Sequence, residues 1–398
     1  MNNPKVSIQK VYKIFGKRTT KALEDLKNGK DKETILEETK QVIALNNISL
    51  DIMPGEVFVI MGLSGSGKST LARCINRLIR PTSGKVLIDG KDITKMNSTQ
   101  LRETRRKKMG MVFQNFGLFP HLNILDNVAY GLKIQGVEKS KRYEQAGAAI
   151  DQVGLKGWEM KYPEELSGGM QQRVGLARAL ANDPDILIMD EAFSALDPLI
   201  RADMQDELVD LQKIMKKTII FITHDLDEAI KIGDRIALMK DGQVIQVGTA
   251  QDILINPADE YVSKFTENVD KNKVFTAEQI MREPTALANI TDNPQDIMDK
   301  IIEKKIDSIF VVDKDNNLKG LIRRKELERA IKNKDTNITK YLDFNFTKVR
   351  KHRSLESLLA PLANSNEPIA IVSSKNKLLG IVIRSYIFEA ITGGVKSE

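Results

Sequence analysis

The octapeptide GLSGSGKS at residues 62–69 is the most informative segment of this chain. It follows the apolar run Val57–Met61, which predicts a strand, and it leads into Thr70–Leu78, which predicts a helix. A strand that enters a glycine-rich turn and then a helix presents successive backbone N–H groups to a phosphate chain, and the helix N-terminus adds its partial positive charge. The sequence therefore predicts a phosphate-binding loop. The alternative is a glycine-rich turn in which the lysine occurs by chance.

Each residue type in this loop suits a task in binding a nucleoside triphosphate. Glycines allow positive φ angles and a close approach of the backbone, which a Cβ would hinder. Lys68 is expected to reach the β- and γ-phosphates, and the hydroxyl of Ser69 is expected to ligate Mg²⁺. The residues predicted to hold the phosphates are Gly62, Ser64, Gly65, Ser66, Gly67, Lys68, Ser69 and Thr70.

Length and composition describe a chain with room for two or three domains. Of its 398 residues, 41% are hydrophobic and 29% are charged. The longest apolar runs, such as Val57–Leu63, are too short to cross a bilayer, and the first residues lack the apolar core of a secretory signal. The single cysteine, Cys74, suits a reducing cytoplasm and is expected to be a buried thiol rather than a reactive one.

The positive charge of the chain is concentrated in one segment, residues 319–353, called the basic block below. It holds twelve Lys or Arg and four acids, a net charge of +8. The whole chain carries +7, so the remainder is close to neutral at −1. A local excess of this size indicates an anionic partner.

Apolar runs and amphipathic stretches alternate from the first residues to about residue 265, as in an α/β domain. Val6–Phe15 and Val42–Ile52 read as strands, and between them Lys17–Lys40 is a charged, helical insert. Further strands are expected at Lys85–Ile88, Met109–Phe113, Ile186–Met189, Thr218–Ile222 and Arg235–Met239, and helices at Glu144–Val153 and Arg201–Lys216. Phe265–Phe275 is polar and charged, as expected of a linker.

The last third of the chain contains an internal repeat. Ile306–Ile331 and Asn366–Ile391 align without gaps at a period of 60 residues. Each unit reads as strand, polar turn, strand and helix. Two such units can bury their faces against each other where one alone could not.

Several elements downstream of the phosphate loop complete a nucleotide-hydrolysing site. An apolar strand ends in Asp190 and Glu191, which places one carboxylate to bind Mg²⁺ through water and the other to polarise an attacking water. In the motif LSGGMQQR at residues 166–173, a serine and two glycines start a helix, which is a second anion-binding N-terminus. Gln114 follows a strand, Asp197 lies shortly after the two carboxylates, and His224 ends another strand. Taken singly, His224 could be an ordinary histidine at the end of a strand, and Gln114 an exposed amide.

At these residues the sequence resembles the ATP-binding-cassette (ABC) ATPases, from about Val6 to Phe265. The LSGGxQ motif between the phosphate loop and the paired carboxylates is the specific feature. The resemblance implies that two subunits enclose two ATP molecules, each phosphate loop facing Ser167, Gly168 and Gly169 of the partner. It assigns Glu191 as general base or water-orienting group.

The same resemblance implies roles for the remaining motif residues. His224 contacts the γ-phosphate and holds the attacking water, Gln114 contributes to Mg²⁺ and senses the γ-phosphate, and Asp197 couples the two sites. The adenine is expected to stack on an aromatic residue of the first strand. Phe15 is favoured over Tyr12, and simple core packing is the alternative for Phe15.

Transport is a separate inference, because ABC ATPases also serve repair, translation and chromosome maintenance. The chain shows neither a long coiled coil nor two cassettes. Phe116–Tyr130 is apolar for a loop beside an active site, as for docking a membrane subunit, or else it is a buried loop of the core. The insert Lys17–Lys40 and the segments Phe58–Ser64 and Met189–Arg201 resemble the ATPases of glycine betaine/proline betaine importers.

Those ATPases carry a tandem CBS pair, which the C-terminal repeats resemble. The expected fold is therefore α/β: a P-loop NTPase (ABC ATPase) domain at 1–265, a linker at 266–275, and α+β CBS repeats at 276–335 and 336–396. The resemblance implies a homodimer joined to membrane permease subunits at the cytoplasmic face of the membrane, with a substrate-binding protein or fused domain. The cofactors implied are ATP and Mg²⁺. A regulatory ATPase without a membrane partner is the competing function.

The CBS-like repeats depart from the common adenosine-binding pattern. Arg323 and Glu326 in the first repeat, and Ile383 and Tyr386 in the second, stand where a Thr and an Asp usually hold phosphate and ribose. Arg324 and Arg384 occupy equivalent positions and could clamp phosphates. Cyclic di-AMP is one candidate ligand.

The second regulatory hypothesis concerns the basic block. Attraction to an anionic membrane would be screened as cytoplasmic salt rises, because the Debye length shrinks from about 10 Å at 0.1 M to about 3 Å at 1 M salt. An ordinary solvated basic face is the alternative. Nucleic-acid binding is not favoured, because the block offers no stacking platform beyond Tyr341, Phe344 and Phe346.

Overall fold

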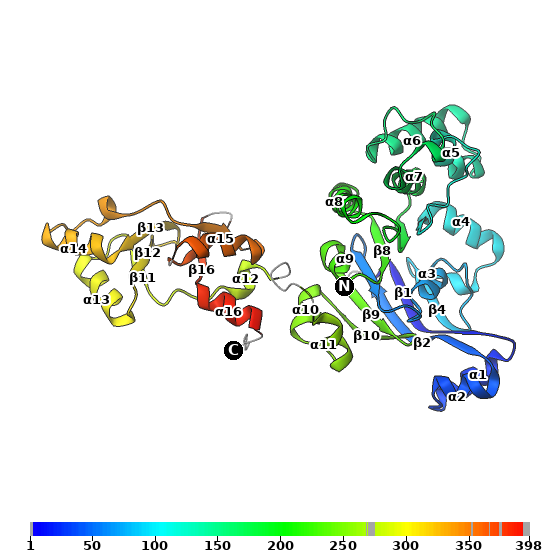
Figure 1. Ribbon diagram of the computed structural model, residues 1–398, viewed down its shortest axis with the longest axis horizontal. Coiled ribbons are helices and arrows are strands. Elements are labelled where there is room, and N and C mark those ends of the chain that lie inside the picture. Colours follow the sequence, from blue (N-terminus) through cyan, green and yellow to red (C-terminus); the bar gives the residue numbers. More distant parts are fainter. Residues whose placement is uncertain are drawn as a thin grey trace. The chain divides into compact units, whose positions relative to one another are not determined.

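The computed structural model describes residues 3–267, 269, 275–351, 353–365, 367–373 and 376–392. The chain divides into two compact units, Met1–Val269 and Asp270–Glu398 (Figure 1). None of the described helices is both long and apolar enough to cross a membrane. Most residues of the expected linker lie outside the described residues.

The first unit is built around a six-stranded sheet in the order β10-β9-β3-β8-β7-β6. Its neighbours pair in parallel except for β9 and β10, which are antiparallel. The strands are β3 (Val57–Met61), β6 (Met109–Phe113), β7 (Ile186–Asp190), β8 (Thr218–Thr223), β9 (Arg235–Lys240) and β10 (Gln243–Gly248). Every residue of β3, β7 and β8 is buried, which is why these strands are continuous apolar runs rather than alternating ones.

A second, antiparallel sheet in the order β2-β1-β4-β5 covers the other side of helix α3 (Lys68–Ile75). Its strands are β1 (Val6–Phe15), β2 (Val42–Ile52), β4 (Ser83–Ile88) and β5 (Lys91–Asp92). Alternate residues of β2 are buried, so one face packs on the core and the other faces solvent. Helices α1 (Thr19–Lys27) and α2 (Lys32–Thr39) form the insert after β1, with a small core of their own around Ala22 and Ile35.

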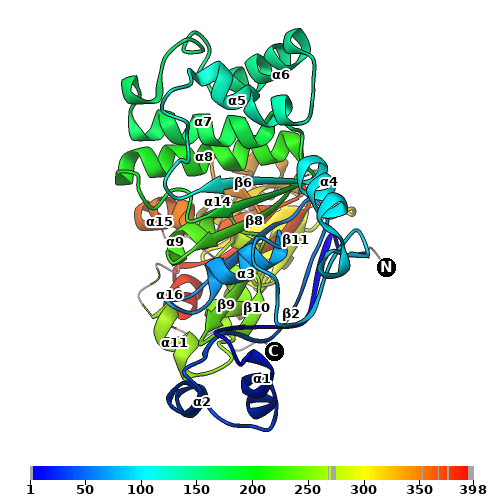
Figure 2. The same ribbon diagram turned by 90° about the vertical axis from the view of Figure 1, so that its right-hand side faces the viewer.

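Helices surround the central sheet. Helices α5, α6 and α7 pack on one another, as both views show (Figures 1 and 2). Cys74, on α3, is buried, and burial raises the pKa of its thiol to about 12, as expected of an inert cysteine. The remaining helices of the first unit are α4 (Ser98–Lys108), α5 (Ile124–Ile134), α6 (Lys139–Gln152), α7 (Gly168–Leu180), α8 (Pro198–Met215), α9 (Leu226–Ile232), α10 (Ala250–Ile255) and α11 (Glu260–Thr266).

Sequence patterns located most strands well and several helix ends less well. The helix expected at Thr70–Leu78 runs instead from Lys68 to Ile75, because Gly67 already begins it and Arg77 adopts a left-handed φ of 53° that ends it. Helix α6 begins earlier than the apolar spacing predicts, at a cap formed by Glu138. The antiparallel strand β10 was not expected, because its residues are half-buried and mixed in character.

The second unit contains two copies of one five-element motif, each with a three-stranded sheet. Each copy starts one strand and one helix before the aligned segments, so the sequence repeat captures only part of it. The first copy comprises β11 (Leu287–Asn289), α13 (Pro294–Lys304), β12 (Ser308–Val312), β13 (Leu318–Arg323) and α14 (Arg324–Lys332), after the short helix α12 (Ala277–Ile280). The second comprises β14 (Lys348–Arg350), α15 (Glu356–Asn364), β15 (Ile369–Val372), β16 (Leu378–Val382) and α16 (Arg384–Thr392); Asn366, where the second aligned segment was expected to begin, lies outside the described residues.

The two copies bury a common apolar cluster, as the repeat argument predicts. Phe310 and Leu321 of the first copy pack with Ala370 and other buried residues of the second. Two equivalent hydrogen bonds between the copies add to this contact. Asn316 Nδ2 donates to the Leu378 carbonyl at 2.9 Å, and Asn376 Nδ2 donates to the Leu318 carbonyl at 3.0 Å.

Candidate active site

The loop between β3 and α3 has the backbone geometry that its glycines predict. Gly62, Gly65 and Gly67 have φ angles of 148°, 80° and 99°. A Cβ on Gly62 would lie 2.2 Å from the Met239 carbonyl oxygen, and one on Gly67 would lie 2.6 Å from that of Ala44. Gly62 and Gly67 are therefore required for close backbone approach, and Gly65 for its conformation alone.

Lys68 points back into the loop from the first position of α3. Its Nζ donates to the Gly62 and Leu63 carbonyls at 2.8 and 3.1 Å, and it lies 4.0 Å from Glu191 Oε1. Burial lowers the pKa of Lys68, while the nearby carboxylates of Glu191 and Asp190 raise it. The loop thus holds an ammonium group in place with its own carbonyls, a suitable counter-charge for phosphate.

The buried hydroxyl of Ser66 indicates a ligand group at this loop. Ser66 is 5% exposed, and its Oγ has no hydrogen-bond partner among the residues that the structure describes. A buried hydroxyl without a partner costs free energy, about 1–3 kcal/mol. An anion with several acceptor oxygens would satisfy it, so the loop fits a phosphate chain on this ground as well as by its glycines.

Ser69 and Asp190 lie together at the Mg²⁺ position that the sequence predicts. Ser69 Oγ donates to Asp190 Oδ1 at 3.0 Å. Burial raises the pKa of Asp190, and the Ser69 hydrogen bond and the Arg73 guanidinium, 3.9 Å away, oppose that rise. A hydroxyl and a carboxylate are oxygen ligands of the kind that Mg²⁺ prefers, with phosphate and water completing the shell.

Glu191 follows Asp190 in a left-handed conformation, with φ of 48°. Its N–H donates to the Ile222 carbonyl of β8 at 3.0 Å, which anchors the residue between two strand ends. Its carboxylate lies 3.5 Å from His224 Nδ1. A non-glycine residue held in this conformation is a strained feature of the kind found at catalytic sites.

The structure therefore gathers Lys68, Ser69, Asp190, Glu191 and His224 at one edge of the sheet. Gln114 comes from the same edge, because its neighbour Phe113 pairs with Asp190 in the β6–β7 register. Its side chain is exposed.

The LSGG motif stands apart from this group within one chain. Among the described residues no hydrogen bond or ion pair joins Ser167, Gly168 or Gly169 to the phosphate loop. Ser167 caps α7, its Oγ accepting from Met170 N–H at 3.3 Å. Asp197 is exposed at the N-cap of α8, and its carboxylate accepts no capping hydrogen bond from the described backbone of that helix. Ser167, Gly168 and Asp197 are exposed and available to another molecule, whereas Gly169 is buried.

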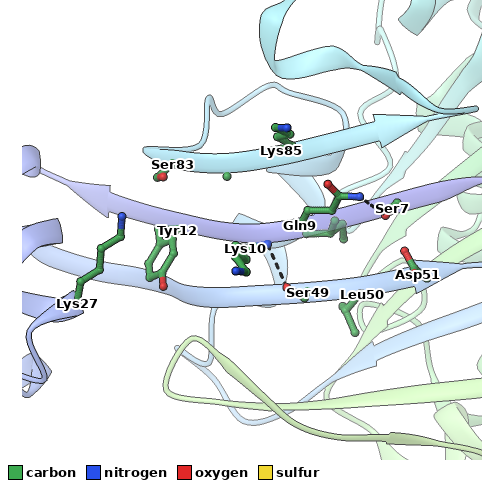
Figure 3. Close-up of a pocket in the computed structure, with 12 residues that line it drawn as sticks. Ser7, Gln9, Lys10, Tyr12, Lys27, Ser49, Leu50, Asp51, Ser83 and Lys85 are labelled. Atoms are coloured by element: carbon green, nitrogen blue, oxygen red, sulfur yellow. Dashed lines mark hydrogen bonds between the residues drawn. The ribbon is translucent and has the colours of Figure 1, made fainter.

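Phe15 and Tyr12 occupy different surfaces. Phe15 ends β1 and is 40% exposed, with Lys13 Nζ 4.7 Å from its ring centroid, so core packing does not account for it. Tyr12 lies beside Lys27 in a hollow of about 870 Å³ on the solvent face of the antiparallel sheet (Figure 3). No residue of the phosphate loop lines that hollow.

Two arginines of the CBS-like unit are engaged within their own repeats. Arg324 contacts Glu328 at 3.2 Å, and Arg384 donates to the Leu362 and Ala363 carbonyls at the end of α15. Arg323 instead faces the second repeat and lines a hollow of about 300 Å³ between the two copies. It contacts two acids, Asp343 and Glu367.

Sequence reasoning also missed Arg73, which lies four residues after Ser69 on the same face of α3. That spacing was a usable signal, because residues i and i+4 of a helix are neighbours. Arg201, which links two loops beside Glu191, left no such signal.

Comparisons with known proteins come from both sequence and structure. A family model described as ABC transporter matches residues 45–194, and one described as CBS domain matches residues 277–333. The glycine betaine transport ATP-binding protein OpuAA of Bacillus subtilis strain 168 is 52% identical, covering 98% of this chain and 93% of that protein. The glycine betaine/proline betaine transport system ATP-binding protein ProV of Escherichia coli strain K12 is 45% identical, covering 97% of each chain. The dimeric structure of MJ0796, described as a bacterial ABC transporter cassette, aligns with a TM-score of 0.52 and 33% identity over 62% of this chain and 98% of that one.

Proposed function

Because the chain belongs to the ATP-binding subunits of ABC importers for glycine betaine and related quaternary amines, we propose that a pair of these chains drives osmoprotectant uptake by hydrolysing ATP in two shared sites. The observation that carries the proposal is the convergence of Lys68, Ser69, Asp190, Glu191 and His224 at one sheet edge.

Within each site the side chains divide the work. Bound ATP and Mg²⁺ supply the phosphoryl group and its electrophilic activation. Lys68 binds the β- and γ-phosphates, while Ser69 and Asp190 hold the metal. Glu191 takes a proton from the attacking water at its carboxylate, and His224 Nδ1, 3.5 Å away, fixes that carboxylate and the water.

A second copy completes each site in this proposal. Ser167, Gly168 and Gly169 present the N-terminus of α7 to the γ-phosphate of the partner, and that end carries a partial positive charge. Gln114 reports the γ-phosphate, Asp197 couples the two sites, and Phe15 stacks on the adenine. The dimeric arrangement described for MJ0796 supports this pairing.

We further propose that the dimer docks on permease subunits at the cytoplasmic face of the membrane, with a substrate-binding protein or fused domain outside. The segment Phe116–Tyr130 supports this in part. Its second half, in α5, is largely buried, as the core-loop alternative held. Its first half remains non-helical and is held rigid by Asn127, whose Nδ2 donates to the carbonyls of Phe119, Leu122 and Asn123.

Reconstitution in liposomes tests the transport function. The full chain should co-purify with an osmoprotectant permease and, in liposomes, hydrolyse ATP faster when glycine betaine is supplied on the substrate side. A matched sample carrying Glu144→Gln, an exposed change on α6, should behave as the parent. ATP hydrolysis that is indifferent both to the permease and to glycine betaine would favour the regulatory ATPase without a membrane partner.

Two regulatory inputs are proposed for the CBS-like unit: ionic strength through the basic block, and an anionic nucleotide such as cyclic di-AMP. Some cations of the basic block are paired with acids inside or outside the block. Lys340 lies 2.7 Å from Asp335, and Lys351 lies 2.6 Å from Glu278. Among the described residues of the block, six exposed cations form no ion pair and are the candidates for contact with anionic lipid: Lys325, Lys332, Lys334, Lys348, Arg350 and Arg353.

The salt concentration at which transport is half-activated in anionic vesicles distinguishes the lysines without an ion pair from those that have one. Replacing Lys332, Lys334 and Lys348 with Gln should lower the salt concentration for half-activation, because each near-surface cation contributes about 1 kcal/mol of attraction to the membrane. The Lys340→Gln/Lys351→Gln pair is the matched control and should shift it less. Cyclic di-AMP added to the same assay should raise the threshold. An unchanged threshold in every arm would contradict both inputs.

A further inference from the structure

Arg201 joins the two loops that flank the carboxylate of Glu191. It lies in the first turn of α8, and its guanidinium reaches back over the turn Ser194–Asp197. Its Nη2 donates to the Leu196 carbonyl at 3.1 Å and to the Ser194 carbonyl at 3.4 Å. Its Nη1 lies 3.7 Å from the Asp225 carboxylate.

Both ends of this contact are anchored beside the catalytic groups. At one end, Ser194 donates to the Glu191 carbonyl from its N–H at 3.2 Å and from its Oγ at 2.9 Å. At the other end, Asp225 follows His224 directly in the chain. Asp225 N–H donates to Thr223 Oγ1 at 3.0 Å, and its carboxylate accepts from Glu228 N–H at 3.2 Å as the cap of α9.

These contacts close a ring. From the Glu191 carbonyl the ring runs through Ser194 to Arg201, then to Asp225 and His224, and returns at the 3.5 Å contact between His224 and the Glu191 carboxylate. Arg201 is the one member of this ring that belongs to neither loop. Other contacts join α8 to α9, such as the hydrogen bond from Gln205 Nε2 to Glu228 Oε1 at 3.2 Å, but Arg201 is the member that contacts the carbonyls of the turn itself.

The guanidinium holds this position without filling its own hydrogen-bond capacity. Arg201 Nε is buried and has no partner in the described part of the chain, although buried donors are normally paired. The contacts at 3.4 and 3.7 Å are long for hydrogen bonds to an arginine. The position of the side chain is therefore a compromise among the Ser194 carbonyl, the Leu196 carbonyl and the Asp225 carboxylate, and it does not optimise any one hydrogen bond.

We propose that Arg201 is a positioning residue. It makes the position of His224 relative to Glu191 depend on the position of the turn Ser194–Asp197. When Asp197 is drawn to the second copy, the turn carbonyls carry Arg201 with them, and Asp225 moves His224 relative to the Glu191 carboxylate. The inference rests on the proposed function, because it assumes that His224 and Glu191 act on the attacking water.

A double-mutant cycle on the purified full chain tests it. Arg201→Met should lower kcat for ATP by about 10- to 100-fold, the loss expected of a misplacement near 1 Å, with KM changed less than about twofold. Adding Arg201→Met to His224→Ala should slow turnover no further, because the arginine acts through the histidine. Arg201→Lys should recover part of kcat, since an ammonium can keep the Asp225 pair.

Two further variants guard against a trivial loss of folding. Asp225→Asn keeps the α9 cap but loses the charge, and should match Arg201→Met in kcat. Lys231→Met removes another α9–α8 link, to the Ala202 carbonyl and Asp206, away from the turn, and should leave kcat unchanged.

The possible outcomes divide clearly. If Glu191→Gln and His224→Ala lower turnover strongly while Arg201→Met leaves kcat within about twofold of the parent, the inference is overturned and the proposed function stands. Additive losses in the cycle, or a change confined to KM, also overturn it. If His224→Ala turns over normally, the assignment of the site fails and takes the inference with it.

Discussion

Glu191→Gln should abolish ATP turnover while leaving ATP binding intact. The amide keeps the shape of the side chain and can still contact His224, but it cannot accept a proton from water. Removing a general base of this kind costs about 10²- to 10⁴-fold in rate. The hydrogen bonds that hold Lys68 and Ser69 go to other groups, and the Glu191 carboxylate contacts Lys68 Nζ only at 4.0 Å. Single-turnover hydrolysis, and retention of labelled ATP on a desalting column, measure the two properties separately.

The variant should also accumulate as an ATP-bound dimer, because nothing then reopens the two sites. Gel filtration with and without ATP would detect the change in size. Glu144→Gln serves as the control, since Glu144 is exposed and remote from the loop. A Glu191→Gln chain that turns over ATP at a rate near that of the parent would remove Glu191 from the chemistry and leave His224 or Gln114 as the residue to examine.

The gathering of the catalytic groups could be predicted because parallel strands bring their carboxyl ends to one edge. Lys68 follows β3, Glu191 follows β7 and His224 follows β8, so the strand order alone makes them neighbours. Each strand is an uninterrupted apolar run, which sequence patterns identify reliably. The polar residue after such a run is then placed to within one residue.

Residues held by irregular backbone were harder to predict. β1 shifts register three times against β2, between Ile8 and Ile14. Simple alternation therefore does not predict on which face of the sheet Tyr12 or Phe15 lies. The structure places Tyr12 in the solvent-face hollow (Figure 3). Phe15 lies at the end of β1 and is exposed. A sequence shows that aromatic residues are present, but not how a bulge rotates them.

The arginines illustrate the same limit. Arg324 and Arg384 are equivalent in the repeat alignment, yet Arg384 is bound by the carbonyls at the end of α15, a helix that lies before the aligned segment. Arg201 acquires its partners from the way α8 leaves the turn Ser194–Asp197. Neither contact follows from periodicity, because each depends on where a separate element ends.

Mixing two inactive variants should restore activity if each site is shared between two copies. Lys68→Ala removes the ammonium from the phosphate loop and should reduce turnover about 10²- to 10³-fold, as expected for a lost electrostatic contact to the transferring group. Gly168→Asp should do the same from the other side, because a carboxylate at the N-terminus of α7 repels the partner's phosphate. It should fold normally: a Cβ at Gly168 meets only ordinary contacts, at 3.7 and 3.8 Å, and an acid there suits the helix dipole.

In an equal mixture, half of the dimers pair one variant with the other. One of their two sites then combines an intact phosphate loop with an intact LSGG motif, so about a quarter of the wild-type sites are complete by the symmetry of the dimer. Steady-state ATPase after the chains are mixed and allowed to exchange measures the recovery. Gly168→Ser, which adds a Cβ without charge, should stay close to the parent. A mixture no more active than its components would contradict sites shared between two copies, as would a Gly168→Asp chain that is active by itself, and the exposed Ser167, Gly168 and Asp197 would then need another explanation.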